Sequence, residues 1–105
     1  MTIDHIQKNR DELLWILEHP KNIKHDDIIK YAHRIGRTLR KKRGGHQTYQ
    51  MKGRRTLVVS THPGAMDEGE VKDSVTLLLG DLDMLEAHEK ARLWKVKMGG
   101  NGHAH

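Results

Sequence analysis

Glycines at three places divide the middle of the chain into segments that are too short for stable helices. Gly36, the pair Gly44-Gly45 and Gly53 leave seven residues between one glycine position and the next. About seven residues make two helical turns at most, but they are enough for an ordinary strand. The chain therefore predicts three short strands, at residues 38–42, 46–51 and 56–60, joined by glycine turns.

Helices are expected on both sides of this segment. Residues 11–18 carry apolar side chains at helical spacing, Ile3 and Ile6 extend the pattern toward the N-terminus, and Pro20 stops it. A second helix is predicted at residues 26–35. It has a buried face formed by Ile28, Tyr31 or Ala32, and Ile35, and Gly36 stands at its C-terminal cap.

Two more helices are expected in the C-terminal half. Residues 69–79 form an apolar face and are followed by Gly80, which is expected to end that helix. Asp83 and Glu86 have the spacing of a capping box for a last helix. That helix carries an apolar stripe, typical of core packing or a partner contact, at Met84, Ala87, Ala91, Trp94 and Met98. The glycine-rich residues 99–105 are expected to form a disordered tail.

The order helix, three strands, helix predicts an α+β domain with a small antiparallel sheet and helices on one of its faces. Strand alternation places Tyr49 on the covered face, whereas His46, Thr48 and Gln50 point outward. The expected buried strand residues are Leu39, Tyr49, Leu57 and Val59.

Length and composition limit the chain to one small domain, at residues 1–98. The 105 residues include no cysteine, which excludes disulfides, thiolate metal sites and a thiol nucleophile. No apolar run is long enough to cross a bilayer, and no signal-peptide pattern opens the chain. We therefore expect a soluble, cytoplasmic protein without a membrane contact.

Positive charge is concentrated in one part of the sequence. Residues 21–55 contain twelve lysines and arginines against two acids, whereas residues 1–20 and 56–105 are net negative. A concentrated basic patch attracts polyphosphate through counterion release, and this favours nucleic acid as the partner. A solubilising surface or a contact with an acidic protein is the alternative.

Several short motifs in this part of the chain occur in a recognisable order. They are the entry His19-Pro20-Lys21-Asn22, a helix ending in Gly36, the run Arg43-Gly44-Gly45-His46 with Tyr49 after it, the segment from Val58 to Pro63 with His62, and Gly69-Glu70-Val71. In this order the motifs resemble the HicA family of toxin–antitoxin modules. The resemblance covers about residues 19–80, with extra N- and C-terminal helices outside the common core.

The resemblance implies a fold like that of double-stranded-RNA-binding domains and an activity as an mRNA endonuclease. It also implies a HicB-like antitoxin that covers the active site. The histidine of the family's Gly-Ser-His motif corresponds to His46. The sequence departs from the family in three places: Gly45 replaces the serine, Arg37 replaces an aromatic residue, and Ser60 replaces a proline. We expect Arg37 to add a phosphate contact, and Gly45→Ser to leave activity unchanged or raise it.

The chemistry of RNA cleavage also favours a histidine at this position. A base must take the proton of the 2′-hydroxyl and an acid must protonate the departing 5′-oxygen, and imidazole can do either near neutral pH. Cationic side chains can stabilise the negative charge that develops on the phosphorane during cleavage. The predicted RNA-binding residues are Arg37, Arg40, Lys41, Lys42, Arg43, Gly44, Gly45, Arg54, Arg55 and His62. His62 is either a second acid–base group, a substrate contact or a residue that shapes its loop.

No cofactor and no metal are expected, because the paired histidines His103 and His105 lack a third ligand. Two functional classes remain, namely a HicA-like endoribonuclease and a non-catalytic RNA-binding module of the same fold. A protein-interaction module with an acidic partner is the third. The stripe on the last helix either folds back on the domain or forms a homo-oligomer.

Overall fold

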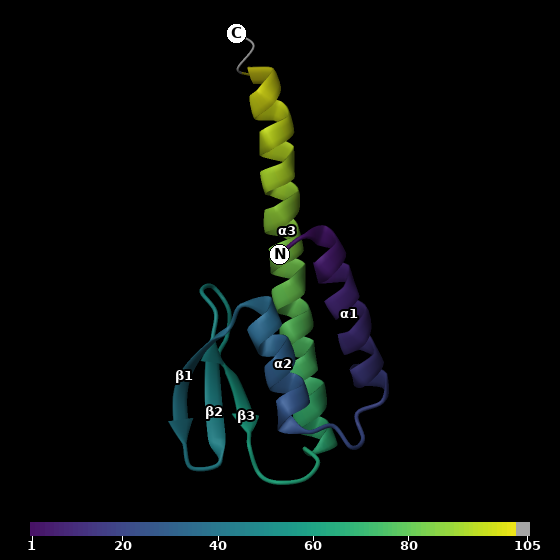
Figure 1. Ribbon diagram of the computed structural model, residues 1–105, viewed down its shortest axis with the longest axis vertical. Coiled ribbons are helices and arrows are strands. Elements are labelled where there is room, and N and C mark those ends of the chain that lie inside the picture. Colours follow the sequence, from purple (N-terminus) through teal and green to yellow (C-terminus); the bar gives the residue numbers. More distant parts are fainter. Residues whose placement is uncertain (103–105) are drawn as a thin grey trace.

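The protein is a mixed α+β domain with three helices and a three-stranded antiparallel sheet, seen here in a computed structural model (Figure 1). The structure describes the backbone of residues 1–102 and the side chains of residues 1–98. The elements follow in the order α1 (Ile3–Glu18), α2 (His25–Ile35), β1 (Thr38–Arg43), β2 (His46–Gln50), β3 (Leu57–Ser60) and α3 (Glu68–Gly102). The predicted first two helices and three strands are therefore confirmed.

The ends of the helices follow from local hydrogen bonding. The side chain of Thr2 accepts a hydrogen bond from the backbone of His5 at the start of α1. At the end of α2, Gly36 has a left-handed φ of 104°, which glycine adopts without steric cost. The side chain of Asp67 accepts hydrogen bonds from the first turn of α3, at the backbone nitrogens of Gly69 and Glu70.

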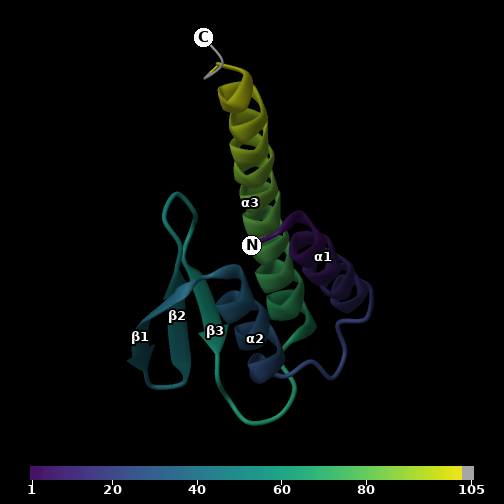
Figure 2. The same ribbon diagram turned by 45° about the horizontal axis from the view of Figure 1, so that its top comes forward.

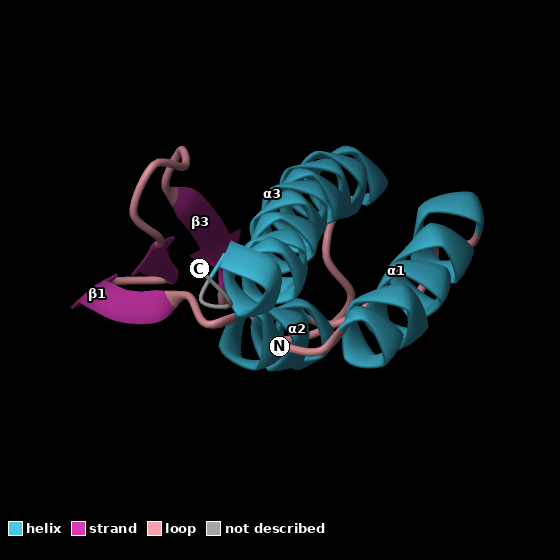
Figure 3. Cartoon of the chain, turned by 90° about the horizontal axis from the view of Figure 1, so that it is seen from above, coloured by secondary structure: helices cyan, strands magenta, loops and turns pink. Residues whose placement is uncertain are grey.

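Three layers make up the body of the domain. The sheet lies on one side of the α2–α3 pair and α1 lies on the other, as the view from above shows (Figure 3). The strands lie in sequence order, and both α2 and α3 contact β3. The apolar core between the layers includes, among its largest fully buried side chains, Ile6, Leu13, Ile28, Tyr49, Val59, Val71, Val75, Leu78 and Leu82.

Polar contacts join α1 to its neighbours. The hydroxyl of Tyr31 on α2 donates a 2.9 Å hydrogen bond to Glu12. Burial, together with this bond, raises the pKa of Tyr31 to about 12, so the phenol remains a donor at neutral pH. Arg10 binds Asp83 and Glu86 of α3 at 3.2 and 3.1 Å.

The structure corrects the expectation of two C-terminal helices. The helix does not end at Gly80, and α3 continues through it to Gly102 (Figures 1 and 2). Residues 99–102, which were expected in a disordered tail, are therefore helical, and the rest of that expected tail, with His103 and His105, lies outside the described residues. Asp83 and Glu86, the expected capping box, instead bind Arg10. Glycine lowers helix stability by about 1 kcal/mol but does not end a helix whose neighbours are packed. Here the two residues after Gly80 are fully buried.

Tyr49, Leu57 and Val59 are buried as expected, but Leu39 is 40% exposed. Leu39 lies opposite Tyr49 on β1, the edge strand, while the helices pack over β3 at the other edge. Alternation predicts the face that a side chain points to, but not whether a helix reaches that part of the face.

A buried cluster of two arginines and one aspartate joins the sheet to α3. Arg37, directly after the cap of α2, binds Asp81 through Nε and Nη2 at 2.6 and 2.9 Å, and its Nη1 donates to the carbonyl of Tyr49 at 3.0 Å. Arg54 binds the same carboxylate at 2.8 Å and donates to the carbonyl of Leu77. The side chains of Arg37 and Asp81 are completely buried.

This cluster generates a stability prediction with a matched control. We expect Asp81→Ala to lower the free energy of unfolding by about 3–5 kcal/mol, because it leaves buried Arg37 without its counter-ion. Asp83→Ala, two residues along the same helix, removes a carboxylate that is 73% exposed and should cost about 1 kcal/mol or less. Urea unfolding of both variants measures the difference. Equal losses would contradict a dominant role for the buried cluster.

Candidate RNA-binding face

His46 is the first residue of β2 and points away from the helical layers. Tyr49, three residues along, faces the core and is 2% exposed, so alternation places His46, Thr48 and Gln50 on the outer face. No described helix packs on that face, and the ring of His46 is exposed. The predicted outward direction of His46 is confirmed.

The neighbouring strands supply the residues around His46. Arg43 of β1 and Ser60 of β3 lie directly opposite it, and Lys41 lies opposite Thr48. Paired residues of antiparallel strands share a face. The outer face of the sheet therefore carries two exposed cations, Lys41 and Arg43, beside His46.

A bulge in β1 distributes the remaining cations of that strand. The register shifts between Leu39 and Lys41, so Arg40 is an extra residue without a partner on β2. Arg40 lines a polar hollow at the opposite end of the sheet together with Lys52 and Arg54. Lys42 lies opposite Gln47 and points toward the other face of the sheet.

One predicted phosphate contact is enclosed in this structure, and a second is largely held by contacts within the protein. Arg37 is fully enclosed, and its guanidinium is bound to Asp81 and to the carbonyl of Tyr49. The guanidinium of Arg54 is only partly exposed and binds Asp81 and the carbonyl of Leu77. The expectation that Arg37 binds phosphate is therefore wrong, because its side chain is part of the core. Arg55 is exposed in the loop between β2 and β3.

The sequence analysis missed Asp81, which holds both arginines. Its position offered one clue, because it lies three residues after Leu78 and one before Leu82, on the buried side of the helix. A carboxylate at a core position needs a buried cation as partner. Gly80 takes part as well, since a side chain at this position would overlap the guanidinium of Arg54.

His62 lies close to His46 at the end of the sheet. Their ring centroids are 6.1 Å apart and their planes are nearly perpendicular, at 78°. The backbone nitrogen of Thr61 donates a 2.7 Å hydrogen bond to the carbonyl of Gly45, and this holds the start of the loop against the β1–β2 turn. In that turn Gly44 has a left-handed φ of 58°, which suits glycine. Gly44, Gly45, His46 and His62 thus form one cluster.

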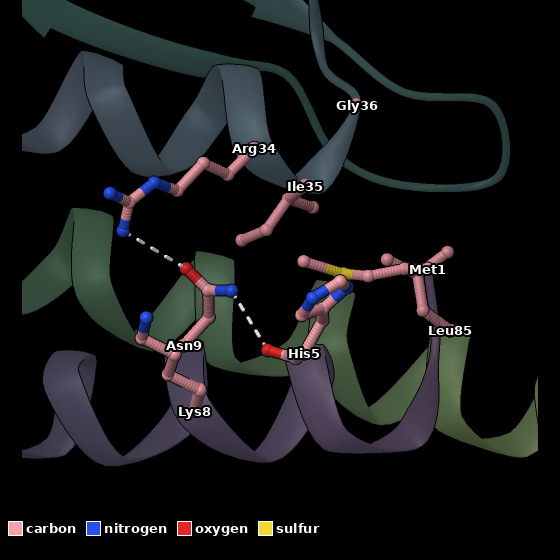
Figure 4. A pocket seen from close by; sticks show the side chains of 8 residues that line it. All are labelled: Met1, His5, Lys8, Asn9, Arg34, Ile35, Gly36 and Leu85. Carbon is pink, nitrogen blue, oxygen red and sulfur yellow. Dashed lines mark hydrogen bonds between the residues drawn. The ribbon is translucent and has the colours of Figure 1, made fainter.

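Another hollow, of about 620 Å³, lies among the three helices beside the cap of α2, lined by Met1, His5, Lys8, Asn9, Arg34, Ile35, Gly36 and Leu85 (Figure 4). In it the amide of Asn9 donates to the carbonyl of His5 and accepts from Arg34. The first of these bonds lies within α1, and the second joins α2 to α1. The hollow shares no residue with the outer face of the sheet.

The described residues contain no cluster of three or more histidine, aspartate and glutamate side chains that could hold a metal ion. None of the described helices is both long enough and apolar enough to span a membrane.

Comparisons of this chain with protein-family models, with curated proteins and with solved structures give no match.

Proposed function

We propose that this protein is a metal-independent endoribonuclease of the HicA kind, in which His46 is an acid–base residue. The observation that carries the proposal is the position of His46 on an open sheet face, directly opposite Arg43 and close to Lys41. An extended nucleic acid strand needs an open, basic surface of this kind. The order α2-β1-β2-β3-α3 also supports a fold like that of double-stranded-RNA-binding domains.

The proposed reaction uses the 2′-hydroxyl of the RNA as nucleophile. A base takes its proton, the 2′-oxygen bonds to phosphorus, and the 5′-oxygen leaves with a proton from an acid. The products are a 2′,3′-cyclic phosphate and a 5′-hydroxyl end. Lys41 and Arg43 lie where cations would stabilise charge on the phosphate during the reaction.

The resemblance also implies a HicB-like antitoxin as partner, which would cover the face around His46. The stripe on α3 is a further candidate surface. It does not fold back on the domain, since Ala87, Ala91, Trp94 and Met98 are all exposed. Trp94 is 61% exposed. Large exposed aromatic side chains are typical of protein contacts, and a second copy of the chain or another protein could pack there.

Cleavage by the purified protein tests the enzymatic proposal. His46→Ala should lower the cleavage rate by about two to four orders of magnitude, the usual effect of losing a positioned acid or base. RNA affinity should stay within a few fold, because the phosphates are held by cations. Turnover should persist in EDTA, and the products should end in 2′,3′-cyclic phosphates. His88→Ala, which removes an exposed histidine of α3, is the control and should cleave at the wild-type rate.

If the wild-type protein binds RNA without cutting it, the enzymatic proposal is wrong and a non-catalytic RNA-binding module is the better description. If an acidic protein binds and RNA does not compete with it, both RNA proposals are wrong.

Salt dependence tests where RNA binds. Log affinity should fall linearly with log salt, by about 0.7 per phosphate contact for a single strand. Lys41→Ala with Arg43→Ala should flatten this slope by about 1.4, the contribution of two contacts. Lys95→Ala with Lys97→Ala removes the same charge from exposed positions of α3 and should change the slope much less. Equal changes from the two pairs would show that RNA binding is not confined to the sheet face.

A further inference from the structure

We propose that His62 is the general acid of the same reaction, paired with His46 as base, and that Gly45 is the residue that makes room for it. This inference rests on the function proposed above and goes beyond it, because it assigns the second proton transfer to a residue from a different part of the chain. The juxtaposition of the two imidazoles at the end of the sheet is the first observation.

The position of His62 depends directly on Gly45. A Cβ atom at position 45 would lie 2.6 Å from Cε1 of His62, 3.1 Å from Nδ1 and 3.2 Å from Nε2. Carbon atoms in contact are normally about 3.5–4.0 Å apart. The imidazole of His62 therefore lies against the bare Cα of Gly45, and a side chain at this position would force the ring to shift.

Backbone hydrogen bonds at the end of the sheet bring His46 and His62 close to each other. His46 pairs with Ser60 at the end of the β2–β3 ladder, and the next residue, Thr61, bonds to the carbonyl of Gly45. His62 follows directly, at the point where the chain leaves the sheet. The positions of both rings are thus tied to one ladder, although the residues are sixteen apart in sequence.

The separation of the rings is suitable for one phosphate group. Hydrogen bonds of about 2.8 Å from nitrogen to phosphate oxygen place two nitrogen atoms roughly 6 to 8 Å apart when they lie on opposite sides of a phosphate. The 6.1 Å between the ring centroids is close to this range, and both rings are exposed, so small side-chain rotations can adjust it. Of two imidazoles on opposite sides of the phosphate, one can take the proton of the attacking 2′-hydroxyl and the other can protonate the leaving 5′-oxygen.

Cations stand beside His46, because Arg43 lies directly opposite it and Lys41 is on the same face. They can stabilise the charge that develops on the phosphate oxygens as the 2′-oxygen attacks. Neutral His46 takes the proton of the 2′-hydroxyl as the 2′-oxygen bonds to phosphorus. Protonated His62 gives its proton to the 5′-oxygen as the phosphorus–oxygen bond breaks. One proton is taken up and one is released, and no oxidant or metal is required.

A substrate with sulfur in place of the leaving 5′-oxygen tests this assignment. A thiolate leaves without being protonated, so it needs no general acid. With ordinary RNA we expect His62→Ala to lower kcat about a hundredfold or more. With the 5′-thio substrate the same variant should fall within about threefold of the wild type, whereas His46→Ala should be impaired on both substrates. KM should change little for His62→Ala.

The substitution Gly45→Ser tests whether the space at position 45 is needed. It introduces the serine of the HicA motif, but its Cβ would displace His62. We therefore expect a loss of activity with ordinary RNA and rescue by the 5′-thio substrate. This reverses the expectation drawn from the resemblance alone. Gly53→Asn is the control, because a Cβ there meets open space and asparagine is among the residues that most often replace glycine at a left-handed φ such as its 79°. It should cleave like the wild type.

The outcomes separate this inference from the proposed function. If the wild-type protein cuts neither substrate, the proposed function is wrong and this inference falls with it. If the wild type cuts and His62→Ala is equally active, or equally impaired on both substrates, or altered only in KM, His62 is not the general acid while the assignment of His46 can stand.

Discussion

The buried pairing of Asp81 with Arg37 and Arg54 is the interaction on which the relative position of sheet and helices depends. Arg37 follows the cap of α2 directly, Arg54 lies in the loop before β3, and Asp81 is in the middle of α3. Arg37 also donates to the carbonyl of Tyr49 on β2. One carboxylate on α3 thus binds two residues that flank the strands, Arg37 before β1 and Arg54 before β3. Removing one member of such a buried network leaves uncompensated charge in a low-dielectric interior, which is far more costly than losing a surface pair.

Much of the fold could be predicted because the relevant forces are local. The left-handed glycine at position 36, the stop before Pro20 and the alternation of β2 each depend on a few neighbouring residues. The direction of His46 followed from that alternation. The predicted end of the helix at Gly80 was wrong because the low helix propensity of glycine is a weak effect of about 1 kcal/mol. Packing of Asp81 and Leu82, together with the guanidinium of Arg54 over Gly80, holds α3 continuous.

The parts that could not be predicted depend on contacts between distant residues. Arg37 and Arg54 were assigned to RNA from their place in a basic stretch, but their partner lies 44 and 27 residues away in the sequence. The approach of His62 to Gly45 depends on the path of the loop after β3, which the sequence does not reveal. At the same position the resemblance to the HicA family and the geometry give different expectations, because the motif describes residue types whereas the structure describes the space between them.

The fold divides the basic stretch between two physical roles. Arg37 and Arg54 share one buried carboxylate and stabilise the domain, whereas Lys41 and Arg43 remain exposed on the outer face. The charge excess of residues 21–55 therefore overstates the charge that a ligand would meet, because only exposed cations would release counterions on binding the proposed RNA. The outer face can therefore carry the exposed cations Lys41 and Arg43 beside the exposed His46, because the contacts that hold the sheet to the helices lie on its other side.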